Sequence, residues 1–156
     1  MAVLQWLETT RLSILIREGD TIWGYPTILT LHTFGMGLLV GPAAVIDLLL
    51  LGIGGRTPLA PMRQLFGLMW VGFWLNAITG TILFAAQATT RGTSALFLAK
   101  LLLVALGVAT TVFIKRTVVD APAEQAARPN PKLLASVSLF AWTATVISGR
   151  LLAYVS

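Results

Sequence analysis

The chain has no cysteine and a single histidine, and both shortages limit the chemistry that it can support. Without thiols it can form no disulfide, no iron–sulfur cluster and no thiolate metal site. Imidazole chemistry is restricted to one position, His32. A haem with two histidine ligands would therefore need a second copy of the chain or a partner subunit.

Charged residues are also scarce. They make up 11% of the 156 residues, against roughly 25% in a soluble domain. Hydrophobic residues make up 56%, and the mean hydropathy is +0.84. The net charge is +5, but the basic residues lie mostly between apolar runs, where they act as topology signals and lipid-headgroup contacts. This distribution indicates a membrane protein and gives no support to nucleic-acid binding.

Four apolar runs are long enough to cross a bilayer, which takes roughly 20 predominantly apolar residues. Unpaired backbone groups are not tolerated in lipid, and the runs lack the alternating pattern of barrel strands, so we expect helices. The sequence thus predicts an all-α integral membrane protein, a four-helix bundle that forms one domain over residues 1–156. The predicted spans cover about residues 26–51, 65–86, 95–114 and 133–154.

A short amphipathic segment precedes the first span. Residues 2–17 place several leucines and Trp6 on one side and charged residues such as Glu8 on the other. The segment is too short and too charged to span, so it is predicted to form one or two helices at the interface, in contact with membrane lipids. Trp23 follows it, at a position where interfacial aromatic residues are expected.

Basic residues favour one orientation of the spans. Six of them lie in the loops after the first and third spans, and three flank the other side of the membrane. Cytoplasmic loops carry an excess of lysine and arginine, so both loops are predicted to be cytoplasmic and both termini to lie outside. The six residues are Arg56, Arg63, Lys115, Arg116, Arg128 and Lys132.

Ionisable residues inside spans are candidates for function, because placing them in lipid is costly. His32 lies about six residues, or roughly 9 Å, inside the outer end of the first span. Lys100 lies at a comparable depth in the third span, and Arg150 lies a few residues inside the outer end of the fourth. Their shared depth predicts a pocket in the outer leaflet, where a haem propionate, a lipid phosphate or a quinone head group would satisfy them.

Two metal-binding hypotheses start from His32. It could ligate the iron of haem b, with Lys100 and Arg150 holding the propionates. Met36 lies one turn along the same helix, a spacing that suits a copper ion bound together with His32. His32 and Met36 cannot be the opposite axial ligands of one haem, because both side chains approach from one helix.

The same residues also have structural interpretations. Lys100 and Arg150 could snorkel to the headgroups, and His32 could bond to a backbone carbonyl or to Thr79. Asp47 is predicted to pair with an arginine of the following loop, on the opposite side of the membrane from His32.

Four further residues are predicted to shape helix packing in the first two spans. Gly37 and Gly41 form a GxxxG pair, which is a weak motif for close helix approach. Pro42 is expected to kink the first span. Asn76 belongs to a small, polar side of the second span.

Motifs along nearly the whole chain resemble a family of small bacterial inner-membrane proteins that have four spans, a short amphipathic N-terminal segment and no established activity. The motifs are WLETTRLS (residues 6–13), W-G-YP (23–26), LHTFGMGLLVG (31–41), DLLLLG (47–52), TGTILFAAQA (79–88), F-x-x-K (97–100) and SGRLLAY (148–154). The resemblance implies a location in the bacterial inner membrane, with periplasmic termini. The histidine motif is also similar to the first span of copper-resistance and cytochrome-b-like membrane domains.

One departure from that family concerns a second histidine, which many relatives carry where this chain has Ile114. That position lies about 14 residues, or roughly 20 Å, beyond Lys100 along a helix. Its loss argues against electron transfer through two haems across the membrane, and leaves a site in the outer leaflet open.

Three functions remain open at the level of sequence. The first is an electron-transfer or quinone- or haem-interacting membrane subunit. The second is a transporter for a small anion or metal, with the same residues as its outer site. The third is a structural or assembly part of a larger membrane complex, or a homo-oligomer.

Overall fold

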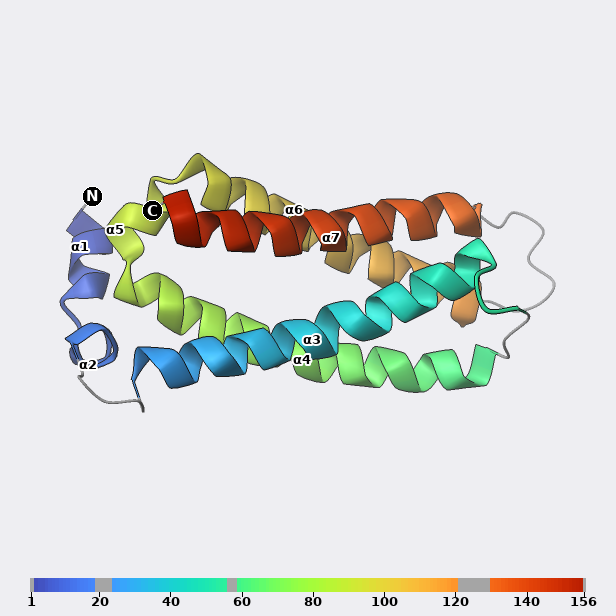
Figure 1. Ribbon diagram of the computed structural model, residues 1–156, viewed down its shortest axis with the longest axis horizontal. Helices are drawn as coiled ribbons and strands as arrows, with labels where there is room; N and C mark the ends of the chain where they lie inside the picture. Colours follow the sequence, from blue (N-terminus) through green and yellow to red (C-terminus); the bar gives the residue numbers. More distant parts are fainter. Residues whose placement is uncertain (1, 19–23, 56–58, 121–129, 156) are drawn as a thin grey trace.

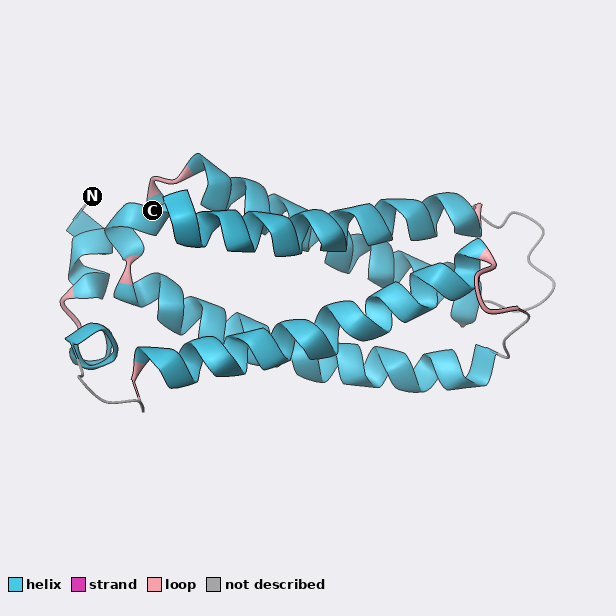
Figure 2. Cartoon of the chain, in the orientation of Figure 1, coloured by secondary structure: helices cyan, strands magenta, loops and turns pink. Residues whose placement is uncertain are grey.

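The computed structural model describes residues 2–18, 24–55, 59–120 and 130–155 of the protein. These residues form helices, and no strand occurs in the described ranges (Figure 2). The predicted all-α class is confirmed. In order, the helices are α1 (Ala2–Glu8), α2 (Arg11–Glu18), α3 (Tyr25–Leu51), α4 (Leu59–Ala86), α5 (Ala88–Gly92), α6 (Ala95–Ile114), the π-helix η1 (Lys115–Val119) and α7 (Pro131–Val155).

Four of these segments are long and apolar enough to cross a membrane: Tyr25–Leu51, Met62–Ala86, Ala95–Val119 and Pro131–Leu152. The protein is thus a multi-pass membrane protein. The two chain termini lie at the same end of the bundle (Figure 1), as an even number of spans requires. We call this the terminus end, and we call the opposite end, where α3 and η1 finish, the loop end.

The helix boundaries differ from the predicted ones by one or two residues in α3 and α7, and by more in three places. Helix α4 begins at Leu59, inside the segment expected to be a loop, because Pro61 falls in the first turn, where a missing backbone N–H costs no hydrogen bond. The third span continues beyond Ile114 as η1. The predicted loop before the third span contains the short helix α5. The predictions for Trp23, Arg56 and Arg128 lie outside the described residues.

Helices α3 and α4 approach closely at Gly72. A Cβ atom at this residue would lie 2.6 Å from the Leu39 backbone nitrogen and 2.8 Å from the Gly35 carbonyl oxygen, so only glycine fits. Gly35 in turn faces Asn76. The predicted pair Gly37 and Gly41 is exposed, with open space around both positions, and takes no part in packing within the bundle.

Helices α6 and α7 form the second close pair. The indole ring of Trp142 lies against Gly107, where a Cβ atom would come within 2.8 Å of it. Trp142 is 1% exposed, and its Nε1 donates a hydrogen bond of 3.4 Å to the Thr111 hydroxyl. The two pairs are joined mainly through α3 and α7, so α3 and α7 are central and α4 and α6 are peripheral.

The apolar core occupies the loop-end half of the bundle. Its buried members come from α3, α4, α6, η1 and α7 and include Leu39, Ile46, Phe66, Ile114 and Trp142. Helix α3 ends in a left-handed Gly52 (φ 93°), a conformation that glycine adopts without steric cost. Pro42 is buried, and α3 runs through it as one helix.

Candidate functional site in the membrane

His32 lies on α3 in the terminus-end half of the bundle and is half-buried. Its Nδ1 is 2.9 Å from the hydroxyl oxygen of Thr79 on α4. The Thr79 hydroxyl donates its own proton to the Leu75 carbonyl, at 2.6 Å. Because a hydroxyl has one proton, we assign the proton of this contact to Nδ1, which leaves Nε2 as the unprotonated ring nitrogen. The Asn76 backbone also hydrogen-bonds His32. The sequence-based pairing of His32 with Thr79 is confirmed.

Two glycines, Gly80 on α4 and Gly35 on α3, make room for the polar side chains of this layer. A Cβ atom at Gly80 would lie 3.1 Å from the Cε1 atom of His32, so the ring fits over a residue without a side chain. One turn away, Asn76 packs against Gly35, and its Nδ2 is buried without a hydrogen-bond partner among the described residues. The layer around His32 therefore offers one acceptor, Nε2, and one unpaired donor, Nδ2.

Lys100 reaches this layer from α6. Its side chain is half-buried, and a Cβ atom at Gly149 of α7 would lie 3.6 Å from both Cε and Nζ. The Lys100 ammonium group therefore lies within van der Waals reach of α7 at Gly149. Lys100 is close enough to interact electrostatically with His32 and with Arg91. Two of the three predicted site residues, His32 and Lys100, are thus near one another.

Arg150 differs from the other two. Its side chain is exposed, and within the described part of the chain it forms no hydrogen bond or ion pair with His32 or Lys100. Its neighbour in sequence, Gly149, is the residue that Lys100 contacts.

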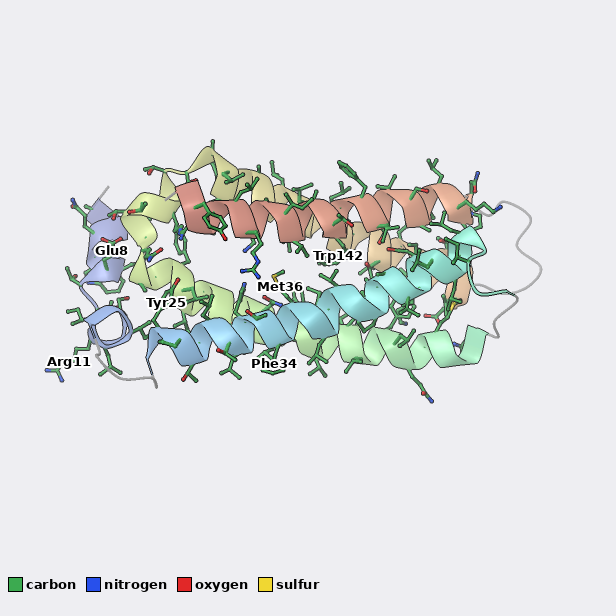
Figure 3. All side chains as sticks on the ribbon, in the orientation of Figure 1. Glu8, Arg11, Tyr25, Phe34, Met36 and Trp142 are labelled. Atoms are coloured by element: carbon green, nitrogen blue, oxygen red, sulfur yellow. The ribbon has the colours of Figure 1, made fainter. Side chains whose placement is uncertain are left out.

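Met36 lies one turn from His32, half-buried, on the side of α3 that faces α7 (Figure 3). It could add one sulfur ligand to a metal at His32. The described residues contain no group of three histidine, cysteine or acidic side chains that could hold a metal ion. His32 and Met36 alone are too few for a copper centre, whereas a single haem iron needs only one histidine.

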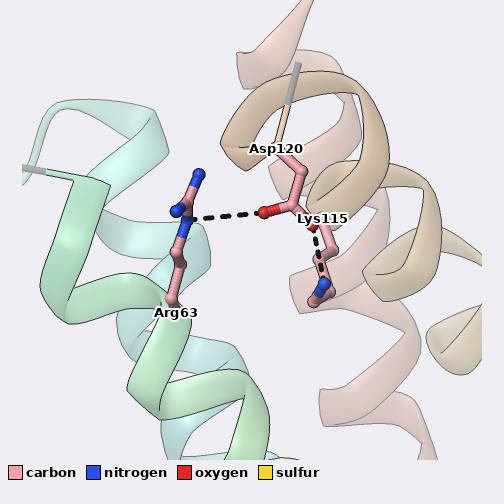
Figure 4. Close-up of polar contacts among 3 residues, drawn as sticks. All are labelled: Arg63, Lys115 and Asp120. Carbon is pink, nitrogen blue, oxygen red and sulfur yellow. Dashed lines mark hydrogen bonds and ion pairs between the residues drawn. The ribbon is translucent and has the colours of Figure 1, made fainter. Parts of the chain in front are cut away.

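The loop-end half holds the acid that was predicted to pair with an arginine. Asp47 is 1% exposed, and the described arginine of the following segment, Arg63, is bonded elsewhere. The Arg63 Nε lies 3.4 Å from Asp120, which also accepts a hydrogen bond of 2.6 Å from the Lys115 ammonium (Figure 4). The predicted pairing of Asp47 is wrong for Arg63. Arg63 pairs with the exposed Asp120, so it does not have to enter the bundle to find an acid.

The terminus end is closed by polar contacts that sequence reasoning missed. The Glu8 carboxylate accepts hydrogen bonds from the Thr89 backbone N–H (2.8 Å) and hydroxyl (2.6 Å), at the first turn of α5. Arg91 donates to the Leu152 carbonyl at 2.7 Å, in the last turn of α7. A glutamate within an amphipathic segment and an arginine next to a span were the available signals, but neither indicates a partner far along the chain.

Comparisons with protein-family models, with curated proteins and with solved structures gave no match. The layer around His32 and Lys100 is the described region whose geometry bears most directly on function.

Proposed function

We propose that this protein is a membrane subunit of an electron-transfer system that binds a quinone head group in the terminus-end half of the bundle. The proposal rests on one observation. Thr79 accepts a hydrogen bond from Nδ1–H of His32, which leaves Nε2 as a hydrogen-bond acceptor within a spanning segment. Under the predicted orientation, this layer lies in the outer leaflet.

The surrounding donors suit the two oxygens of a quinone. The Nε2 lone pair of His32 can accept a hydrogen bond from a quinol hydroxyl, and the Lys100 ammonium can donate to a quinone carbonyl. The unpaired Nδ2 of Asn76 adds a neutral donor in the same layer. A quinone supplies two-electron, two-proton chemistry, and the chain would orient its head group and accept or return a proton at Nε2.

Haem b is the competing ligand of the same nitrogen. His32 can serve as one axial ligand, because ligating histidines commonly hold Nδ1–H in a hydrogen bond. Lys100 can pair with one propionate. The opposite axial position has no candidate among the described residues, since Met36 lies on the same helix. The donor set therefore fits a quinone better than a six-coordinate haem.

The test is to add quinone to the purified protein in detergent and to measure its binding by the quenching of tryptophan fluorescence. His32→Leu is expected to weaken binding about tenfold, since hydrogen bonds in binding sites are worth roughly 1 to 2 kcal/mol. The matched control is Thr33→Val, one residue away, where the hydroxyl bonds only to its own helix at Leu29.

The same preparation supplies the contrary outcomes. A visible absorption spectrum with a Soret band that is lost in His32→Leu would identify haem b as the ligand in place of quinone. Equal quinone affinity in wild type and His32→Leu, with no haem band, would refute both ligands and leave His32 as a packing residue.

A second candidate function is assembly with another chain, and one observation favours it. Thr33, Phe34 and Gly37 help to line a groove of about 340 Å³ on the outer side of α3. Gly37 and Gly41 on that side are exposed and unobstructed, which lets the helix of a second copy approach closely. Gly37→Leu would then convert dimers to monomers in cross-linking experiments in membranes, while Gly67→Leu, on an exposed side of α4, would not.

A further inference from the structure

Asp47 is the most deeply buried ionisable group among the described residues. It lies on α3 and is 1% exposed. It borders a small space between α3, α4 and α6 that has no room for a water molecule. The other residues around that space are Ala43, Ile46, Phe66, Met69, Thr111 and Ile114. Ser138 of α7 faces the carboxyl group from the remaining side.

One oxygen of the carboxyl group lacks a partner. Oδ2 of Asp47 makes no hydrogen bond with any described residue. The Ser138 hydroxyl lies near the carboxyl group and has no hydrogen-bond partner of good geometry among the described residues. The Thr111 hydroxyl accepts a hydrogen bond from Trp142. A native structure pairs nearly all such buried groups, so an unpaired carboxyl oxygen indicates that something beyond the described side chains satisfies it.

No cation among the described residues borders the space around Asp47. None of the other residues around the space is ionisable. The described basic residues at the loop end are Arg63 on α4 and Lys115 in η1, which both pair with Asp120, together with the exposed Arg116 and Lys132. An isolated carboxylate in an apolar enclosure is too costly to persist, and such a group takes up a proton instead.

We propose that Asp47 is a proton-binding site in the loop-end half of the bundle. The size of the space selects the ligand. A sodium or potassium ion needs several oxygen ligands and room for the ion itself, whereas only Asp47, Ser138 and Thr111 offer side-chain oxygens here. A proton needs no additional volume. The protonated carboxyl group can donate a hydrogen bond, which the Ser138 hydroxyl can accept.

The structure also provides a place where the site can open to the loop end. Ile114 borders the space and is followed directly by η1, and π-helical turns within helices occur frequently at functional sites. In α3, Pro42 removes one backbone hydrogen bond five residues before Asp47. Local opening of η1 would bring the carboxyl into contact with water at the loop end.

This site is independent of the proposed quinone site. Asp47 lies about 22 Å from His32 along α3, at 1.5 Å per residue. The close contact of Gly72 with Gly35 and Leu39 lies between them. The two proposed sites share no residue, so either proposal can fail alone.

The experiment is infrared spectroscopy of the full chain in phosphatidylcholine vesicles at neutral pH. Wild type is expected to show the C=O stretching band of a protonated carboxylic acid, shifted by D2O, and Asp47→Asn is expected to lack it. Asp120→Asn is the matched control, which removes an exposed, ion-paired carboxylate and keeps the band. His32→Leu is also expected to keep it, whatever its effect on quinone.

Three results would overturn the proposal. They are the absence of an acid band in wild type, an equal band in Asp47→Asn, and a band that D2O never shifts, because a binding site must exchange its proton.

A second measurement needs no substitution, in case Asp47→Asn does not fold. Dicyclohexylcarbodiimide is an apolar reagent that reacts with protonated carboxyl groups in membranes. The acid proton moves to a nitrogen of the reagent and the carboxyl oxygen bonds to its central carbon, so the adduct retains every atom of both. Mass spectrometry is expected to find the adduct on the peptide that contains Asp47. Modification of other acids with Asp47 unmodified would contradict a protonated Asp47.

Discussion

Single atoms decide how closely α3 and α4 can pack. At Gly72, an added methyl group would meet backbone atoms of Leu39 and Gly35, which cannot rotate away as a side chain can. At Gly67, on the same helix, a methyl group would meet nothing within 4 Å. The two glycines therefore have opposite roles in one helix, although their sequence contexts are both apolar.

Gly72→Ala is expected to destabilise the protein by about 1–3 kcal/mol, the usual cost of overpacking. Gly67→Ala is expected to be neutral or to stabilise the helix by up to about 1 kcal/mol, because alanine is the better helix former. Thermal unfolding of both variants in the same detergent measures the difference. Equal melting temperatures would mean that the helices separate without penalty at the crossing.

The hydrogen bond between His32 and Thr79 makes a prediction at the same scale. Thr79→Val removes the acceptor of the Nδ1 proton, so the fixed tautomer of His32 should be lost. Nitrogen-15 NMR of labelled histidine is expected to show one well-defined Nδ1–H tautomer in wild type and a mixture in Thr79→Val. Thr81→Val is the control, because that hydroxyl bonds only to Ala77 of its own helix. A mixture already present in wild type would contradict the assignment.

At the scale of elements, the short helices hold the ends of the long ones. Helix α1 is attached to α5 through Glu8 and through the contact of Leu4 with Gly92, where a Cβ atom would lie 2.9 Å from the leucine side chain. At the other end, Asp120 connects η1 to α4 through Arg63. Substitution of Glu8 should therefore loosen the terminus end alone, and protonation of Asp120 should loosen the loop end alone.

Glu8→Ala is expected to release α1 from α5, because two hydrogen bonds to a carboxylate are lost together. Amide hydrogen exchange in residues 2–8 should become at least several times faster while exchange in α3 stays the same. The exposed Gln5→Ala serves as the control. Unchanged exchange in α1 would show that the apolar contact with Gly92 is sufficient.

The loop end is expected to respond to acid. The hydrogen bond and charge of Lys115, with the charge of Arg63, lower the pKa of Asp120 below its ordinary value of 3.8. A lowered folded-state pKa stabilises the structure above the ordinary value, and this contribution is lost as the pH falls through the lowered one. After correction for the pH dependence of intrinsic exchange rates, amide exchange in residues 115–119 should therefore accelerate below about pH 4 in wild type. In Asp120→Asn it should be fast and independent of pH over the same range. A wild type that shows no acceleration would refute this role.

At the scale of the whole molecule, the apolar composition of the runs predicts where the spanning helices lie, but it does not predict which helices touch or through which residues. The third helix was predicted over residues 95–114 and α6 covers Ala95–Ile114. In lipid, however, every side of a span is apolar, so the periodicity of the sequence cannot tell which side turns inward. For that reason the GxxxG pattern of Gly37 and Gly41 does not locate the close contact of the bundle, which Gly35 and Gly72 make. The π-helical turn likewise follows from packing and has no signal in composition.

The orientation of the bundle remains a prediction from the distribution of basic residues. Both termini are expected on the periplasmic side, so alkaline phosphatase fused after Ser156 should be active and a fluorescent protein that needs the cytoplasm should not. The reverse pattern would place the terminus end, with His32, in the cytoplasmic leaflet.

The central position of α3 and α7 bears on how the chain is assembled during synthesis. The ribosome releases α3 and α4 one after the other, and they can form their hairpin at once. Helix α6, with Lys100 in its first turns, enters the membrane before α7, the helix that its lysine contacts. Until α7 is made, α6 lacks its main partner and depends on the insertion machinery. We expect a chain that stops after Ala86 to persist in cells, and one that stops after Asp120 to be degraded.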